Sequence, residues 1–190
     1  MPDVFECGLI GMGPAGIGLA MSLRGTSTIK NMICFERGSF NIDVNCSALS
    51  EKECCCSNSC GVISGVGGAS TLSSGKISNF PAGSGLAEFF DSEKQLRELL
   101  DEVIQFLSDE IQLKRIEIDT ATKMNAKAFY KQRNIDYKYY DVYEFDGKSY
   151  RSFIQKTVQE LMDEGLQLFD NAEVLDVHHD PHTSDRKSVV

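Results

Sequence analysis

A glycine-rich turn near the start of the chain constrains the fold more than any other feature of the sequence. Residues 11–16, Gly-Met-Gly-Pro-Ala-Gly, match the pattern G-x-G-x-x-G. The apolar stretch Val4 to Ile10 precedes this turn, and a helical pattern from Ile17 to Arg24 follows it, with Gly25 as the stop. The pattern predicts a strand, a tight turn and a helix that leads into a second, parallel strand by a right-handed connection.

Each residue of the turn has a physical role in binding a dinucleotide. Gly11 permits the tight turn, Gly13 lets a pyrophosphate approach the backbone, and Gly16 lets the helix pack closely on the strand. The amino end of the helix, with Pro14 and Ala15, presents free N–H groups and a partial positive charge to phosphates. A glycine-rich turn in some other α/β protein remains the alternative.

The next apolar run, Ile29 to Phe35, predicts a second buried strand, which ends at Glu36. The Glu36 carboxylate can accept both hydroxyls of an adenosine ribose, and its charge would repel the 2′-phosphate of NADP. The early position of the turn and the sequence Glu36-Arg37-Gly38 resemble flavoproteins with two dinucleotide-binding domains. That resemblance favours FAD over NAD and implies that Arg37 belongs to the cofactor site.

A second glycine block, residues 64–78, reads Ser-Gly-Val-Gly-Gly-Ala-Ser-Thr-Leu-Ser-Ser-Gly-Lys-Ile-Ser. It resembles the uncharacterised FAD-dependent dehydrogenases, which are related to the aminoacetone-oxidase-like and HI0933-like flavoproteins, and it departs from their pattern at Ser70 and Ser74. Consecutive glycines let backbone N–H groups converge on an anion, whereas a flexible Gly/Ser linker is the alternative. The resemblance implies cofactor contacts from Gly67, Gly68, Ala69, Ser70, Ser73 and Lys76.

The remaining patterns predict further helices and strands. A helix over 93–111 is capped by Ser92 and Gln95, and a second helix runs from Tyr150 to Glu164. The aromatic segment Tyr137 to Phe145 favours a strand. Two further strands are expected at 166–169 and 172–177, then a polar hairpin tip over 178–186 and a last strand from Ser188.

We therefore expect an α/β fold with a Rossmann-like three-layer FAD-binding domain over residues 1–190. Residues 1–38 would form the ADP-binding unit, 39–90 a cofactor loop rich in Gly, Ser and Cys, and 91–190 the remaining helices and strands. This domain is expected to be incomplete at its carboxyl end.

Charge and composition exclude several classes of partner. The net charge is −9, and no basic run is present, which disfavours nucleic acid and anionic membranes. The most apolar stretch, residues 8–23, is shorter than the roughly 20 residues of a membrane span. Seven cysteines, three of them adjacent at 54–56, fit reduced thiols and predict a cytoplasmic protein.

Cys46, Cys54, Cys55, Cys56 and Cys60 lie close together in the sequence. A metal site, a redox pair beside a flavin, and buried or incidental thiols are the three interpretations, and the spacing favours the last. We expect no metal site. His178, His179 and His182 are interpreted as a solvated turn rather than as metal ligands.

The function predicted from these features is hydride or electron transfer through FAD, with the catalytic residues and the small-molecule substrate unknown. NAD(P)H is the candidate electron donor. An NAD-binding Rossmann dehydrogenase is the alternative, but no convincing Tyr-x-x-x-Lys motif lies between Tyr139 and Tyr150. A non-catalytic truncated flavoprotein fragment is the other alternative: the chain alone is expected to be inactive, with a separate downstream segment as a candidate partner.

Overall fold

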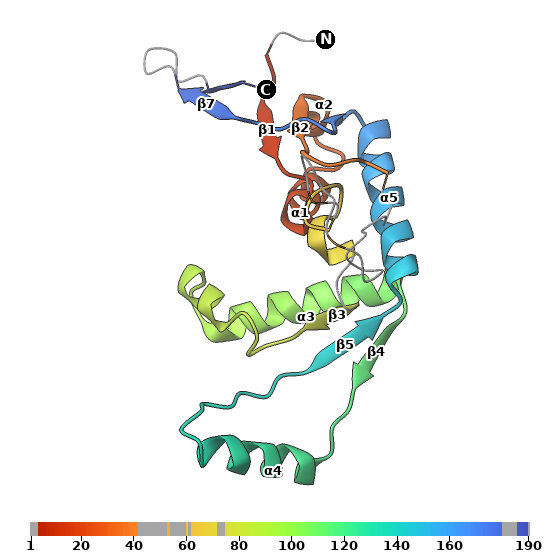
Figure 1. The fold of residues 1–190 in the computed structure, drawn as a ribbon. Coiled ribbons are helices and arrows are strands. Elements are labelled where there is room, and N and C mark those ends of the chain that lie inside the picture. Colours follow the sequence, from red (N-terminus) through yellow and green to blue (C-terminus); the bar gives the residue numbers. More distant parts are fainter. Residues whose placement is uncertain are drawn as a thin grey trace. The chain divides into compact units, whose positions relative to one another are not determined.

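The computed structural model describes residues 4–41, 53, 60, 62–71, 75–179 and 186–189. The chain divides into two compact units, whose elements are labelled in Figure 1. Unit 1 contains Met1–Ser73 and Tyr150–Val190, and unit 2 contains Ser74–Ser149. The chain therefore leaves unit 1, forms the whole of unit 2, and then returns to complete unit 1.

Unit 1 is built on a parallel sheet with strands in the order β1-β2-β6. β1 (Cys7–Ile10) pairs with β2 (Met32–Phe35), which pairs with β6 (Gln167–Phe169). α1 (Pro14–Ser22) and the short α2 (Ser27–Lys30) connect the first two strands, and α5 (Gly147–Asp163) precedes β6. The expected α/β, Rossmann-like fold class is confirmed.

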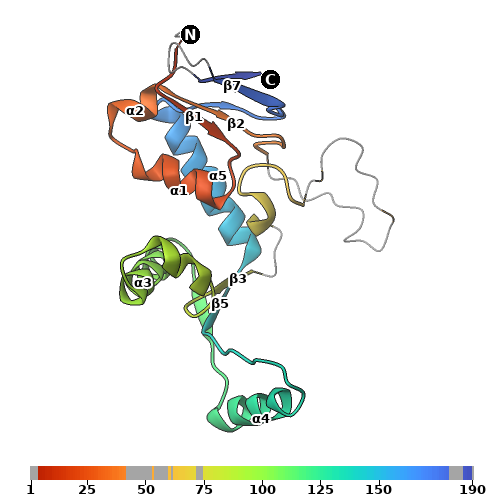
Figure 2. The same cartoon turned by 90° about the vertical axis from the view of Figure 1, so that its left-hand side faces the viewer.

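The helices α1 and α5 lie on the same side of this sheet (Figure 2). Both steps along the strand order run in one direction, so right-handed connections place both helices on one face. Arg24, just after α1, forms ion pairs with Glu160 and Glu164 at the end of α5, at 3.2 and 2.5 Å. The Arg24 guanidinium also lowers the pKa of the Glu164 carboxyl below its ordinary value, mainly through a hydrogen bond.

The two faces of the sheet differ in burial. Met32 and Cys34 of β2 are fully buried. Phe35 alternates to the opposite face, where its ring stacks on that of Phe169 with 5.7 Å between the centroids. Ile10, in register with Phe35, is 59% exposed on that face.

The elements of unit 1 begin at different residues from those expected. The strand starts at Cys7 rather than Val4, and the helix starts at Pro14 rather than Ile17, because proline is well suited to the first helical position. Residues 29 and 30, expected as the start of the second strand, belong to α2 instead, and the strand begins at Met32.

The carboxyl-terminal part of unit 1 forms an antiparallel ribbon. β7 (Asp176–His179) pairs with β8 (Arg186–Val189), so the two strands extend into the span expected as a hairpin tip. His178 and His179, which were expected in a solvated turn, therefore lie on β7. His182 lies outside the described residues.

Unit 2 has an antiparallel sheet in the order β3-β5-β4. Its strands are β3 (Lys76–Ser78), β4 (Leu113–Ile116) and β5 (Val142–Phe145). Its helices are η3 (Ser84–Phe89), α3 (Glu93–Glu110) and α4 (Thr120–Lys131). The helix expected over 93–111 is confirmed, whereas α4 was not expected at all.

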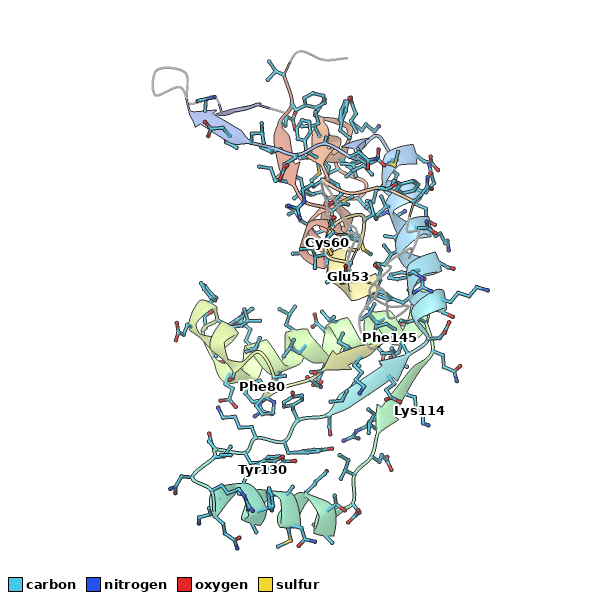
Figure 3. All side chains as sticks on the ribbon, viewed as in Figure 1. Glu53, Cys60, Phe80, Lys114, Tyr130 and Phe145 are labelled. Atoms are coloured by element: carbon cyan, nitrogen blue, oxygen red, sulfur yellow. The ribbon has the colours of Figure 1, made fainter. Side chains whose placement is uncertain are left out.

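The aromatic segment of unit 2 is strand only at its end. Residues 137–141, expected as strand, have no regular structure, and only Val142–Phe145 pair with their neighbours. Instead, Tyr137 stacks on Tyr130 of α4, which is labelled in Figure 3, with 5.1 Å between the ring centroids. Throughout the described ranges, every helix is too short or too polar to cross a bilayer.

Candidate functional site

The turn between β1 and α1 has the geometry that its glycines predict. Gly11 adopts a φ of +90°, which side chains rarely tolerate. A Cβ on Gly16 would lie 2.2 Å from the carbonyl oxygen of Gly11, so only glycine allows α1 to approach the turn this closely. Gly11 and Gly16 therefore shape the turn through the backbone itself.

Gly13 differs from these two glycines because the space beside it is open. Its backbone is extended, with φ −75° and ψ −176°, a conformation open to any residue. A Cβ built on Gly13 meets no atom of the described residues within 4 Å. The exposed Pro14, which has no N–H, and Ala15 follow in the first turn of α1, where the helix itself offers no acceptor for the N–H groups of Ala15 and the next residues. The turn thus combines free space with a polarised helix end.

The second glycine block lies directly against this turn. The Gly67 N–H donates to the carbonyl oxygen of Met12 at 2.7 Å. A Cβ on Gly68 would lie 3.7 Å from the Cα of Gly13. Gly67 and Gly68 have φ of +83° and +53°, and they lead into η2 (Gly68–Thr71). The structure therefore brings together two glycine segments that lie about fifty residues apart in the sequence.

Glu36 is buried where the two glycine segments meet, with only 6% of its surface exposed. Its Oε2 accepts a hydrogen bond from the Met12 N–H, and its Oε1 accepts from the N–H groups of Gly38 and Gly65, all at 2.8 Å. A carboxylate has about four acceptor positions. Within the part of the chain that the structure describes, three are occupied by backbone groups, so one is left, on Oε2, for a ligand hydroxyl.

Ser70 is engaged within unit 1. Its hydroxyl donates to the carbonyl oxygen of Gly67 at 2.6 Å and lies 3.1 Å from the hydroxyl of Tyr150 on α5. Thr71 is buried, and its hydroxyl donates to the carbonyl oxygen of Gly68 at 2.9 Å. These hydroxyls close the η2 turn, and Ala69 beside them is exposed.

The other residues predicted to contact a cofactor are more scattered. Arg37 is exposed and forms an ion pair with Glu173 at 3.6 Å. Ser73 lies outside the described residues, as do Cys46, Cys54, Cys55 and Cys56. Lys76 lies on β3 of unit 2, opposite Glu144 of β5.

Cys34 is a buried thiol beside the site. Its Sγ lies 3.8 Å from the Sδ of Met12. Burial, and secondarily the charge of Glu36, raises the pKa of Cys34 to about 12. The thiol is therefore protonated at neutral pH and is a poor nucleophile.

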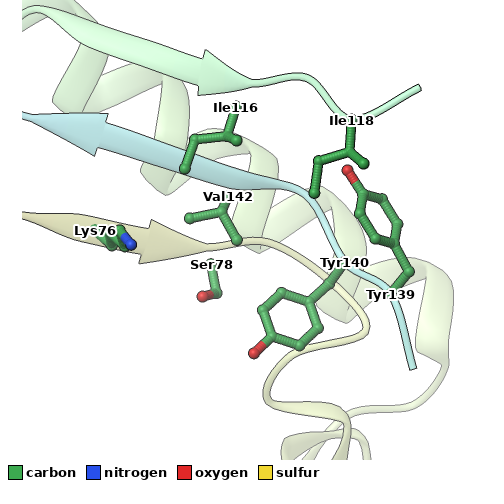
Figure 4. A pocket seen from close by; sticks show the side chains of 7 residues that line it. All are labelled: Lys76, Ser78, Ile116, Ile118, Tyr139, Tyr140 and Val142. Carbon is green, nitrogen blue, oxygen red and sulfur yellow. The ribbon is translucent and has the colours of Figure 1, made fainter. Parts of the chain in front are cut away.

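Unit 2 carries a separate cavity of about 310 Å³ on one face of its sheet (Figure 4). Its walls are mainly apolar and aromatic, and Lys76 contributes an ammonium group. The lining residues are Lys76, Ser78, Ile116, Ile118, Tyr139, Tyr140 and Val142.

Sequence reasoning missed the parts played by Gly38, Gly65 and Met12. A Cβ on Gly38 would lie 2.2 Å from the Gly65 nitrogen, so these two backbones are in direct contact. The glycines were visible in the sequence, directly after Glu36 and at the start of the second block. Their mutual contact was not, because it depends on how the loops fold.

Comparison with known proteins yields only remote similarities. No protein-family model matches the chain, and no curated protein matches it. Among solved structures, THI4 of Thermovibrio ammonificans is 14% identical, with a TM-score of 0.41 over 97% of this chain and 45% of that one. An L-amino acid deaminase from Proteus vulgaris is 15% identical, with a TM-score of 0.40 over 95% of this chain and 43% of that one. The chain spans less than half the length of either protein.

Proposed function

We propose that this protein binds FAD on unit 1 and serves hydride or electron transfer through the flavin. The observation that supports this most strongly is the open space beside Gly13, bordered by the second glycine segment at Gly68 and by the amino end of α1. A pyrophosphate needs close backbone approach, unpaired N–H groups and a positive helix end, and all three meet at this point.

In this proposal the chain holds the ADP half of the cofactor. Gly11, Gly13 and Gly16 with the intervening Pro14 and Ala15 form the pyrophosphate turn. Gly67 and Gly68 close it from the other side. The remaining acceptor position on Glu36 Oε2 takes one ribose hydroxyl, instead of the two hydroxyls expected from the sequence.

The burial of Glu36 bears on which dinucleotide fits. A 2′-phosphate would bring a second negative charge against a buried carboxylate, which is costly at low dielectric, so NADP is disfavoured. FAD is preferred over NAD on the resemblance of the second glycine block. When bound, FAD supplies the hydride-accepting ring, and the protein supplies position and electrostatics. The substrate is a small molecule, with NAD(P)H as the proposed electron donor.

A single methyl group tests the placement of the pyrophosphate. Gly13→Ala adds a Cβ that meets no atom of the described part of the chain within 4 Å, on a backbone that alanine readily adopts. Its methyl would therefore collide only with a ligand. An overpacking cost of about 1–3 kcal/mol corresponds to a loss of FAD affinity of about 5- to 150-fold. Binding is measured by titration calorimetry with FAD, ADP, NAD and NADP.

Gly18→Ala is the matched control, because a Cβ there also meets none of the described atoms within 4 Å and the residue is exposed on α1. It should bind FAD as the parent chain does. Equal affinities of the Gly13→Ala and Gly18→Ala variants would refute the site. Tighter binding of NAD than of FAD would refute the choice of cofactor.

A further inference from the structure

One buried carboxylate connects three separate segments of unit 1. Glu36, after β2, accepts backbone hydrogen bonds from Met12 in the turn after β1, from Gly38 in its own loop and from Gly65 in the second glycine block. All three distances are 2.8 Å, and the carboxylate is 6% exposed. We infer that Glu36 is a positioning residue that assembles the cofactor site through these three N–H groups before any ligand binds. This inference rests on the proposed function for its biological meaning.

The type of side chain matters because all three partners are donors. An ionised carboxylate only accepts hydrogen bonds and offers both oxygens, whereas an amide offers one oxygen and an NH₂ group that donates. An amide at position 36 would therefore turn a donor toward at least one backbone N–H. That N–H would be left buried without an acceptor, which carries the full cost of its desolvation.

The contact with Gly65 is part of a continuous attachment of the second glycine block. Three consecutive N–H groups donate to three different acceptors. The Gly65 N–H donates to Glu36 Oε1. The Val66 N–H donates to the Ser39 carbonyl, and the Gly67 N–H donates to the Met12 carbonyl. Val66 is also 1% exposed. The Glu36 bond is thus the first of three consecutive hydrogen bonds that place Gly67 and Gly68 beside Gly13.

This arrangement separates two roles for the same side chain. A role limited to the ribose would act only when a ligand is present, and an amide could still accept one ribose hydroxyl. A role in assembly acts in the free protein and requires the carboxylate. The two roles therefore differ in what they predict for Glu36→Gln without cofactor.

Hydrogen exchange of the ligand-free 190-residue chain, resolved at single amides by NMR, tests the inference. In the parent chain the amides of Met12, Gly38 and Gly65 should exchange slowly. In Glu36→Gln at least one of the three should exchange about 10- to 150-fold faster, the equivalent of losing a charge-assisted hydrogen bond of about 1.5–3 kcal/mol. Amides in α3 of unit 2 should be unchanged. Glu173→Gln is the control, since it removes a neighbouring but exposed carboxylate.

A second variant covers the case in which Glu36→Gln does not fold. In Gly38→Ala, the new Cβ would lie 2.2 Å from the Gly65 nitrogen and push that N–H away from Glu36, while the carboxylate stays intact. The Gly65 amide should then lose its protection. Fast exchange of the three amides in the parent chain, or unchanged Gly65 exchange in Gly38→Ala, would overturn the inference.

Titration with FAD separates this inference from the proposed function. At a temperature where Glu36→Gln is folded by circular dichroism, assembly predicts that FAD affinity falls about 10- to 150-fold. A ribose-only role predicts a change of no more than a few-fold, which would overturn the inference while leaving FAD binding intact. If the parent chain binds no FAD but shows the three protected amides, the proposed function fails and the assembly role stands.

Discussion

At the scale of single residues, Cys34 shows how burial next to the candidate site changes the pKa of a thiol and lowers its reactivity. The thiol is fully buried between the sheet and the helices, and burial, with the Glu36 charge adding to it, raises its pKa to about 12. A thiolate at this position would be poorly solvated and would face a carboxylate. Cys34 is therefore suited to packing rather than to redox exchange with a flavin.

We expect Cys34 to resist alkylation by iodoacetamide at pH 9 in the folded chain and to react once urea unfolds it. The check is mass spectrometry of the peptide that carries Cys34. The thiol also stabilises the folded state less as pH rises, because the folded protein holds this proton more tightly than the unfolded chain. That loss should begin near the ordinary thiol pKa of 9.0 and continue toward about 12. Rapid labelling of folded protein at pH 9 would contradict this account.

At the scale of elements, α3 combines a local start signal with a narrow buried stripe. The Ser92 hydroxyl accepts a hydrogen bond from the Gln95 N–H at 3.2 Å, and the Gln95 side chain accepts one from the Asp91 N–H at 3.1 Å. Leu96 and Ile104 are buried, whereas Leu99 and Val103, which are also apolar, are each 41% exposed. The start of the helix thus depends on its cap as much as on its packing.

We expect Ser92→Ala to lower the free energy of unfolding of unit 2 by about 1 kcal/mol, because it removes the acceptor for an otherwise unpaired N–H. Urea denaturation followed by tyrosine fluorescence measures this. Ser108→Ala is the control in the same helix: its hydroxyl donates to the Ile104 carbonyl four residues earlier, a bond that does not stabilise helices. It should be neutral or slightly stabilising, and equal losses for both variants would contradict a capping role.

At the scale of the whole molecule, each unit has its own sheet and its own helices. Units with separate cores can unfold in separate steps, so a single midpoint need not describe the chain. The sequence supplies a probe for each unit. Five of the six tyrosines lie between residues 130 and 143 in unit 2, and Cys34 lies in unit 1.

We therefore expect urea unfolding followed by tyrosine fluorescence and by labelling of Cys34 to give two different midpoints. On the proposed function, added FAD should raise the Cys34 midpoint, since a ligand stabilises the structure that binds it. The tyrosine midpoint should move less. Coincident midpoints that shift together with FAD would mean that the two units unfold as one.

The parts of the fold that were predictable depend on local patterns. The strand, turn and helix around Gly11 to Gly16 follow from residues within one short window, and α3 follows from a clear helical period with a cap. α4 was not predicted because its apolar residues do not form a buried face. No residue of this helix is buried in the structure. The segment before Val142 contains strand-forming tyrosines, but two of them contact α4 instead of a strand: Tyr137 stacks on Tyr130, and the ammonium of Lys123 lies over the ring of Tyr139.

The site was predictable in its glycines but not in its connections. The spacing of Gly13 and Gly16 within the pattern G-x-G-x-x-G predicts a dinucleotide-binding turn. The second glycine block resembles a segment of a flavoprotein family. The partners of Glu36 are backbone N–H groups, which every residue except proline possesses, so the sequence holds no mark of which ones it binds. Likewise, the contact between Gly38 and Gly65 depends on the fold of two distant loops.

The strand order β1-β2-β6 has a consequence for how the chain is made on the ribosome. Phe35 of β2 pairs in register with Phe169 of β6, and all of unit 2 is translated between them. At about 5–20 residues per second, β2 waits roughly 7 to 27 seconds for its second neighbour. During that interval one edge of β2 is open, and an open strand edge is a template for pairing with other chains. The nascent protein is therefore most exposed to misassembly after its glycine-rich turn has formed and before β6 has emerged.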